Sequence, residues 1–164
     1  ALAAGTVDLV LAPGTPQGAV ELTPLLVDEL VFVAAPDHPL ARRTYVDAQD
    51  LVDQTYLTYN PAPTPGFEYD RFIRLGTDYP RIVRVVPQTS AIVELVAAGA
   101  GVSILSRWAL SPAIDAGRIV AVPCGPTGLS LGWTVVSRRS GQADSPTRRV
   151  AEHLSTVFGG QNER

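Results

Sequence analysis

Apolar residues along this chain fall into short continuous runs and into runs spaced as on one face of a helix. Residues 83–86 are β-branched except for one arginine, which favours a strand, and Pro87 ends that strand because proline brings no N–H to a β-ladder. Residues 90–98 then carry apolar side chains at helical spacing, and residues 102–105 form a second short apolar run. The pattern predicts a strand, a helix and another strand.

The two ends of this helix carry typical boundary residues. Thr89 and Ser90 offer hydroxyl groups for an N-cap. Gly99 and Gly101 supply a C-terminal stop, where a left-handed residue is usually needed. A strand–helix–strand crossover joins parallel strands, so we expect a mostly parallel sheet in an α/β fold.

The same spacing places a polar turn at the carboxyl end of a strand and at a helix N-terminus, where open α/β sheets bind small ligands and anions. Two further polar turns follow predicted strands. Turns of this composition also occur as ordinary connections, and the hydroxyls could serve only as caps, so both interpretations stay open. The candidate ligand-binding residues are Gln88, Thr89, Ser90, Pro13, Gly14, Thr15, Tyr59 and Asn60.

The remaining pattern alternates strands and helices without a repeat. Two lobes are suggested, one inserted into the other. The predicted strand at 30–35 leaves the first βα region, and the predicted strand at 131–137 returns just before the last helix. In the last helix, Val150, Leu154 and Val157 are expected to face inward. The predicted strands are 7–11, 30–35, 56–59, 119–122 and 131–137, with a weaker extended segment at 22–26, and the predicted helices are 46–51, 67–75, 108–116 and one beginning at 145–146.

Composition narrows the class of protein. With 164 residues, of which 46% are hydrophobic, the chain can form one compact domain or two small lobes. A net charge of −3 without a basic run argues against direct binding of nucleic acid. No apolar run is long enough to span a bilayer. The single cysteine excludes an internal disulfide and favours a reducing compartment, hence the cytoplasm.

A search for catalytic chemistry finds no constellation. His38 and His153 lie far apart, without the spacing of metal ligands, and are expected to be surface histidines. Ser103 lacks the glycine frame of a nucleophile elbow, and Cys124 has no histidine near it in the sequence. We therefore expect no enzyme activity, no metal and no cofactor.

Several stretches resemble the effector-binding domain of LysR-type transcriptional regulators. They are Gly5-Thr-Val-Asp-Leu-Val-Leu, the run Leu30-Val-Phe-Val-Ala-Ala-Pro-Asp-His-Pro-Leu-Ala, and Ile92-Val-Glu-Leu-Val-Ala-Ala-Gly-Ala-Gly-Val-Ser-Ile-Leu. The resemblance covers nearly the whole chain. Segment 51–59 and Arg107-Trp-Ala-Leu look closest to the branch that regulates methionine biosynthesis and senses homocysteine.

The resemblance implies a fold like that of type 2 periplasmic binding proteins, with two α/β lobes, two crossover strands and a small effector in the cleft. One lobe would comprise residues 1–33 and 134–164, and the other residues 34–133. The first lobe would be incomplete, and the N-terminal winged helix-turn-helix would be absent, so this chain would reach DNA only through that missing part. In the family, effectors contact the loop that corresponds to Gln88, Thr89 and Ser90, while the loops at Gly14 and Tyr59 have less support.

The resemblance also implies a bacterial, cytoplasmic homodimer or homotetramer with no membrane partner, responding to a small polar metabolite such as homocysteine. The alternative from another functional class is an extracytoplasmic solute-binding protein of a transporter, which shares the fold.

Overall fold

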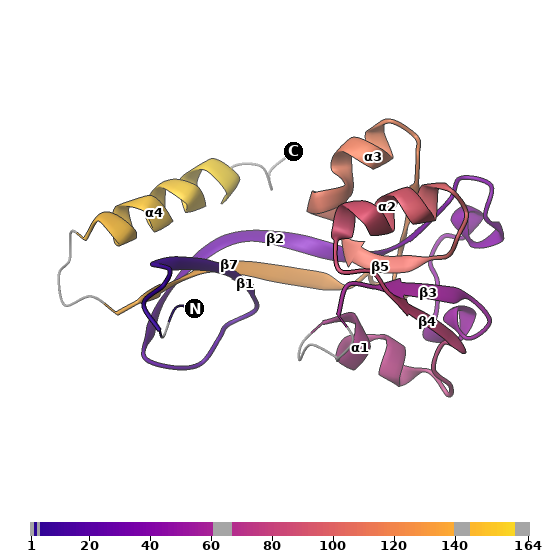
Figure 1. Cartoon of the computed structure of the whole chain (residues 1–164), viewed down its shortest axis with the longest axis horizontal. Coiled ribbons are helices and arrows are strands. Elements are labelled where there is room, and N and C mark those ends of the chain that lie inside the picture. The colour runs from indigo at the N-terminus through magenta and orange to yellow at the C-terminus, as the bar shows by residue number, and fades with distance from the viewer. Residues whose placement is uncertain (1, 3, 61–66, 140–144, 160–164) are drawn as a thin grey trace. The chain divides into compact units, whose positions relative to one another are not determined.

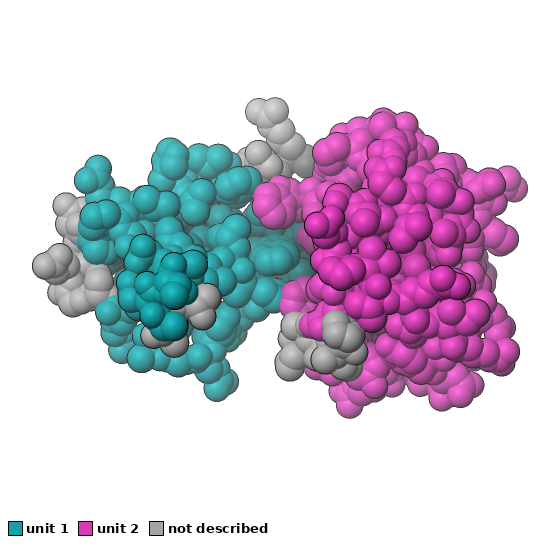
Figure 2. Space-filling view, viewed as in Figure 1, with its two compact units in different colours: residues 1–28, 131–164 teal, residues 29–130 magenta. Residues whose placement is uncertain are grey.

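A computed structural model of the chain describes residues 2, 4–60, 67–139 and 145–159 (Figure 1). The chain forms two compact units, coloured separately in Figure 2: unit 1 comprises residues 1–28 and 131–164, and unit 2 comprises residues 29–130. The chain passes from one unit to the other twice, within strand β2 (Val20–Ala34) and at the start of strand β7 (Ser130–Arg138). The two crossover strands expected from the family resemblance are therefore β2 and β7.

In unit 1, strand β1 (Leu9–Pro13) pairs antiparallel with β7, and helix α4 (Pro146–Gly159) packs on the strands. The buried face of α4 consists of Ala151, Leu154 and Phe158, which contact Leu25 and Val135. The predicted inner face was wrong at two of its three positions, because Val150 and Val157 are each 48% exposed. The predicted set (150, 154 and 157) and the observed set (151, 154 and 158) both have helical spacing. The observed orientation of the helix covers Phe158, which has the larger apolar surface.

Strand β2 is longer than the sequence indicates. The weak extended segment at 22–26 and the predicted strand at 30–35 belong to this one strand of 15 residues. Its first half alternates between more and less exposed positions, as in a strand with one covered face, whereas residues 30–34 are all buried. Because of this alternation the first half contains no continuous apolar run, and the sequence pattern predicts it only as a weak extended segment.

Unit 2 contains the end of β2 together with β3 (Thr55–Thr58), β4 (Ile82–Val85), β5 (Ser103–Ser106) and β6 (Val120–Pro123). Strands β3 and β4 are parallel, and a parallel bridge between Tyr56 and Val102 joins β3 to the start of β5. Strands β5 and β6 are both antiparallel to β2. The expectation of a parallel sheet is therefore correct for β3, β4 and β5 and wrong beside β2, which enters unit 2 from the other unit.

Helix α2 (Thr89–Ala97) and helix α3 (Ser111–Asp115) cover one side of this sheet (Figure 1). Ile92, Val93 and Val96 of α2 pack with Leu57 and with apolar residues of β2 and β5 into the main core of unit 2. Helix α1 (Glu68–Arg71) lies on the other side. The predicted helix at 46–51 is only a 3₁₀ turn, η2 (Ala48–Leu51). The predicted helices at 67–75 and 108–116 are each a short α-helix next to a 3₁₀ turn: α1 with η3 (Ile73–Leu75), and η4 (Arg107–Leu110) with α3.

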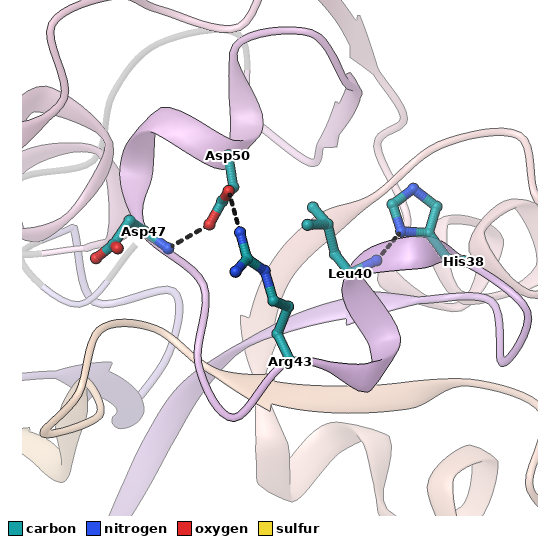
Figure 3. A network of polar contacts seen from close by, with 5 residues as sticks. All are labelled: His38, Leu40, Arg43, Asp47 and Asp50. Carbon is teal, nitrogen blue, oxygen red and sulfur yellow. Dashed lines mark hydrogen bonds and ion pairs between the residues drawn. The ribbon is translucent and has the colours of Figure 1, made fainter.

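The Asp-His-Pro-Leu-Ala stretch forms a capping structure at the start of η1 (Pro39–Arg42) (Figure 3). Nδ1 of His38 accepts a hydrogen bond from the Leu40 N–H at 3.2 Å, and its Nε2 lies 3.2 Å from Oε1 of Gln54. His38 was predicted to be a surface residue, but its ring is partly buried and ties η1 to the loop before β3. Part of the sequence that carries the family resemblance is therefore structural.

Candidate functional site

The ends of β3 and β4 lie side by side in unit 2. In the parallel register Thr58 stands opposite Val85, and the Val86 N–H donates to the Thr58 carbonyl at 2.8 Å. The loops that leave these two strands therefore start next to each other. This places the candidate residues Tyr59 and Asn60 at the same sheet edge as the candidate turn at Gln88.

The loop after β3 is held by the side chain of Thr58. The Thr58 hydroxyl donates to the Asn60 carbonyl at 3.2 Å, and its oxygen accepts from the Asn60 N–H at 3.3 Å. Tyr59 is half-buried, and its ring meets that of Phe67 edge to face with centroids 6.5 Å apart. Burial, with the nearby Glu68 carboxyl, raises the pKa of Tyr59, so its hydroxyl stays protonated and can donate a hydrogen bond.

The turn after β4 differs from its prediction in one respect. The N-cap of α2 is Gln88, in extended conformation at φ −120° and ψ 125°, and Thr89 is the first helical residue. Thr89 and Ser90 therefore do not form the N-cap, and no side-chain cap bond is made at this helix start within the described residues. All three side chains are exposed. Their amide and hydroxyl groups thus project from a helix N-terminus at the sheet edge.

The third candidate turn belongs to unit 1. Pro13 ends β1 opposite Trp133. The Gly14 N–H donates to the Gly132 carbonyl at 2.7 Å, and the Thr134 hydroxyl donates to the Gly14 carbonyl at 2.7 Å. Gly14 has φ 68°, a left-handed conformation that favours glycine, and Thr15 is exposed. This turn is fixed to β7, while the other candidates lie together in unit 2.

A further polar strand end was missed in the sequence. Strand β5 runs parallel to β3 and ends at Ser106, so Ser106 and Arg107 lie at the same edge of the sheet as Thr58. Nε of Arg107 bonds Oε2 of Glu29 at 3.1 Å. The available signal was a polar pair directly after the apolar run 102–105, the same signal that identified the other turns.

The two possible nucleophiles have structural surroundings. Ser103 is fully buried, and its hydroxyl donates to the Leu57 carbonyl at 2.7 Å. Cys124 is also buried, and burial raises the pKa of its thiol to about 12, which keeps it uncharged. Over the ranges that the structure describes, no group of three histidine, cysteine, aspartate or glutamate residues could hold a metal ion, and no helix is long and apolar enough to cross a membrane.

Comparison with known proteins decides the family. The family model described as the LysR substrate binding domain matches residues 1–159. The chain belongs to this family. The fold described above is thus the effector-binding domain of LysR-type regulators, and the family resemblance inferred from the sequence is confirmed.

Similar curated proteins of the LysR family are transcriptional regulators. The regulator MetR of Salmonella typhimurium is 29% identical over 126 residues, which cover 76% of this chain and 39% of MetR. The regulator CbbR of Rhodospirillum rubrum is 28% identical over 126 residues, covering 77% of this chain and 41% of CbbR. The chain therefore spans about two fifths of the length of these relatives.

Solved structures of LysR regulatory domains share the fold. A regulatory domain of MetR from N. meningitidis has a TM-score of 0.80 and 25% identity, covering 98% of this chain and 75% of that one. The effector-binding domain of QuiR in complex with shikimate has a TM-score of 0.75 and 21% identity, covering 98% and 75%. These structures show the shared fold, and the family match favours the regulator over the transporter protein considered above.

Proposed function

We propose that this LysR domain is the sensing part of a transcriptional regulator and binds a small polar or anionic metabolite. The observation that carries the proposal is the pairing of β3 with β4, which sets two polar loops and the N-terminus of α2 at one sheet edge. Such an edge offers hydroxyl, amide and backbone N–H donors to a ligand with several oxygen atoms. Family membership supports the same function.

Within this proposal each polar group has a role. The hydroxyls of Thr89 and Ser90 and the amide of Gln88 bind the polar end of the effector at the positive end of the α2 dipole. Tyr59 donates from its protonated hydroxyl, and Asn60 supplies an amide. We also propose Pro13, Gly14 and Thr15 of unit 1 as effector-binding residues. The support for these three is the family resemblance and the chemistry of their turn.

The effector proposed first is homocysteine, because segment 51–59 resembles the methionine-biosynthesis branch and MetR is among the relatives. Effector binding would act on DNA through another part of the regulator in the bacterial cytoplasm. A ligand shifts such an equilibrium only by its different affinity for the two arrangements of the protein. The proposed role is sensing, without catalysis and without a cofactor.

The proposal includes assembly into a homodimer or homotetramer. Among the described residues, β4 pairs only with β3, so it is an outer strand of its sheet. Ile82, Val83 and Val85 of β4 are all substantially exposed. An edge strand with exposed apolar side chains is a template for another chain, and a second copy in the oligomer would cover it.

The test is titration calorimetry of the full chain with homocysteine, preceded by a thermal-shift screen that also contains shikimate. We expect one screened compound to raise the melting temperature and to bind at one site per chain. Thr89→Ala should weaken that binding about tenfold, as expected for one lost hydrogen bond to a charged group. The melting temperature without ligand should stay the same, because the Thr89 side chain is exposed.

The matched control is Thr44→Ala, which removes another exposed threonine of unit 2 away from the sheet edge. It should leave the affinity unchanged. Equal affinity of the native chain and the Thr89→Ala variant would contradict the assigned site, and a screen without any binding compound would count against the sensing function.

A further inference from the structure

Unit 2 contains a hollow that lies apart from the proposed effector site. Its volume is about 540 Å³, within the range of small-molecule pockets. The hollow is walled by the start of η2, by the stretch from α1 to Thr77, and by the loop at 124–129 between β6 and β7. None of the residues assigned to the effector site lines it.

The walls of this hollow are fixed to one another by hydrogen bonds. The Val46 N–H donates to the Pro123 carbonyl at 2.9 Å, and the Gly125 N–H donates to the Val46 carbonyl at 2.8 Å. The Thr77 hydroxyl donates to Oε1 of Gln49 at 2.5 Å and so joins the stretch after α1 to η2. The hollow is therefore formed before any ligand arrives, which reduces the entropy lost on binding.

The lining combines an apolar floor with two opposite charges. Phe72, Cys124 and Leu129 are buried and contribute apolar surface, and burial keeps the Cys124 thiol uncharged. Arg71 and Asp47 also line the hollow. The ion pairs found among the described residues include neither of them. In Figure 3 the Asp47 carboxyl group points away from Asp50 and Arg43, the nearby charged pair.

The Asp47 side chain takes part in a capping box with the backbone of Asp50 at the start of η2. A carboxylate has further acceptor sites, and neither Asp47 nor Arg71 has an ion-pair partner among the described residues, so both can still meet a charged group of a ligand. A carboxylate is the natural partner of the Arg71 guanidinium, which it can meet with two parallel hydrogen bonds. An ammonium group is the corresponding partner of the Asp47 carboxylate. The apolar floor then suits an aliphatic or aromatic group between or beside these two ends.

We infer that this hollow binds a free α-amino acid with an apolar side chain, its carboxylate on Arg71 and its ammonium on Asp47. Such a site would give the regulator a second small-molecule input in addition to the effector site. The inference rests on the hollow and its charges alone, and it stands or falls independently of the effector proposed above.

The test uses titration calorimetry of the full chain with three probes of similar apolar size: L-leucine, 4-methylpentanoate, which lacks the ammonium group, and 3-methylbutan-1-amine, which lacks the carboxylate. We expect L-leucine to bind and each of the other two to bind at least tenfold more weakly. Arg71→Gln and Asp47→Asn should each weaken L-leucine binding at least tenfold. Asparagine is a good N-cap residue, so the second variant keeps the start of η2 intact.

Three control variants distinguish binding in this hollow from a general effect of charge and from binding at the effector site. Arg74→Gln and Asp78→Asn remove exposed charges nearby that do not line the hollow, and they should leave L-leucine binding unchanged. Thr89→Ala should also leave it unchanged, and loss of binding there would move the ligand to the effector site and overturn the inference. Three other results would also overturn the inference. They are failure of L-leucine to bind, binding of 4-methylpentanoate as tight as that of L-leucine, and dissociation of an oligomer by Arg71→Gln in sedimentation.

Discussion

The Val86 N–H donates to the Thr58 carbonyl at 2.8 Å and so joins the first residue after β4 to the last residue of β3. One backbone bond thus sets the spacing of the two loops that carry the effector residues proposed for unit 2. Thr58 adds a second restraint, because its hydroxyl bonds both backbone groups of Asn60. The geometry of the proposed site therefore depends on a buried residue that need not touch the ligand.

We predict that Thr58→Val weakens effector binding about threefold to tenfold. Valine keeps the shape of threonine but removes both hydrogen bonds to Asn60, so the loop must be ordered when the ligand binds. The free energy of unfolding should fall by about 1 kcal/mol, the usual contribution of such a bond. The affinity is measured by calorimetry with the compound found in the thermal-shift screen. Thr58→Ser keeps the hydroxyl and should bind normally, and an equal loss in both variants would contradict the positioning role.

We predict that Gly101→Ala destabilises unit 2. A Cβ at this position would lie 2.5 Å from the Thr55 carbonyl oxygen and 3.2 Å from Cγ of Leu57, so the backbones of β3 and the start of β5 would have to separate. Overpacking of this kind costs about 1–3 kcal/mol. Urea unfolding measures the change. Gly132→Ala is the control, because no atom of the residues that the structure describes lies within 4 Å of its added Cβ. Equal stability of the two variants would show that the close approach at Gly101 is relieved at no cost.

We predict that His38→Ala lowers the free energy of unfolding by about 1 kcal/mol, the usual effect of losing a helix cap. The ring of His38 accepts from the Leu40 N–H and lies within hydrogen-bond distance of Gln54, so its removal leaves both groups without these partners. Thermal and urea unfolding measure the loss. His153→Ala removes an exposed histidine from α4 and should have no measurable effect. If both variants behave alike, the cap contributes nothing to stability.

The sequence predicted those elements whose signals are local. The stretch from β4 through α2 to β5 was found because Pro87 and Gly99 mark its ends, and Gly99 indeed has a left-handed φ of 72°. The side-by-side position of the Tyr59 and Gln88 loops followed from no local signal. It depends on β3 and β4 being neighbours, and strand order is fixed by long-range pairing.

Errors arose where two local patterns competed or where a role needed a distant partner. In α4, the sets that contain Val157 and Phe158 fit the helical period equally well, and only packing against Leu25 selects the second. The capping role of His38 and the ion pair of Arg107 with Glu29 were missed because the bonding groups come from other segments. The hollow at Arg71 and Asp47 unites three separate segments, so no local pattern predicts it.

We predict that Glu68→Gln stabilises the chain at pH 7. Burial raises the pKa of Glu68 above its ordinary value of 4.5, and a backbone hydrogen bond to the carboxyl together with the one from Tyr56 offsets this only in part. Its Oε2 atom is buried without a partner among the described residues. A carboxyl with a raised folded-state pKa contributes full stability below its unfolded pKa and loses it as the pH rises through the folded pKa.

The native chain should therefore lose stability from about pH 4.5 upward relative to the Gln variant, whose amide does not ionise. The expected gain for Glu68→Gln at pH 7 is on the order of 1 kcal/mol, and it should vanish near pH 4. Urea unfolding at a series of pH values measures the difference. Asp78→Asn, which neutralises an exposed carboxylate, should show no such trend. A stability difference that is constant from pH 4 to pH 7 would contradict the role of ionisation.

The last prediction concerns assembly at the edge strand β4. Ile82 is 50% exposed on this strand, so Ile82→Lys should cost the folded chain little while placing a charge at the edge that a second copy would cover. We expect the dissociation constant of the oligomer to rise at least tenfold in analytical ultracentrifugation. Val150→Lys, at a similarly exposed valine on α4, should leave assembly unchanged. If Val150→Lys dissociates the oligomer and Ile82→Lys does not, the copies meet through α4, and β4 must be assigned another role.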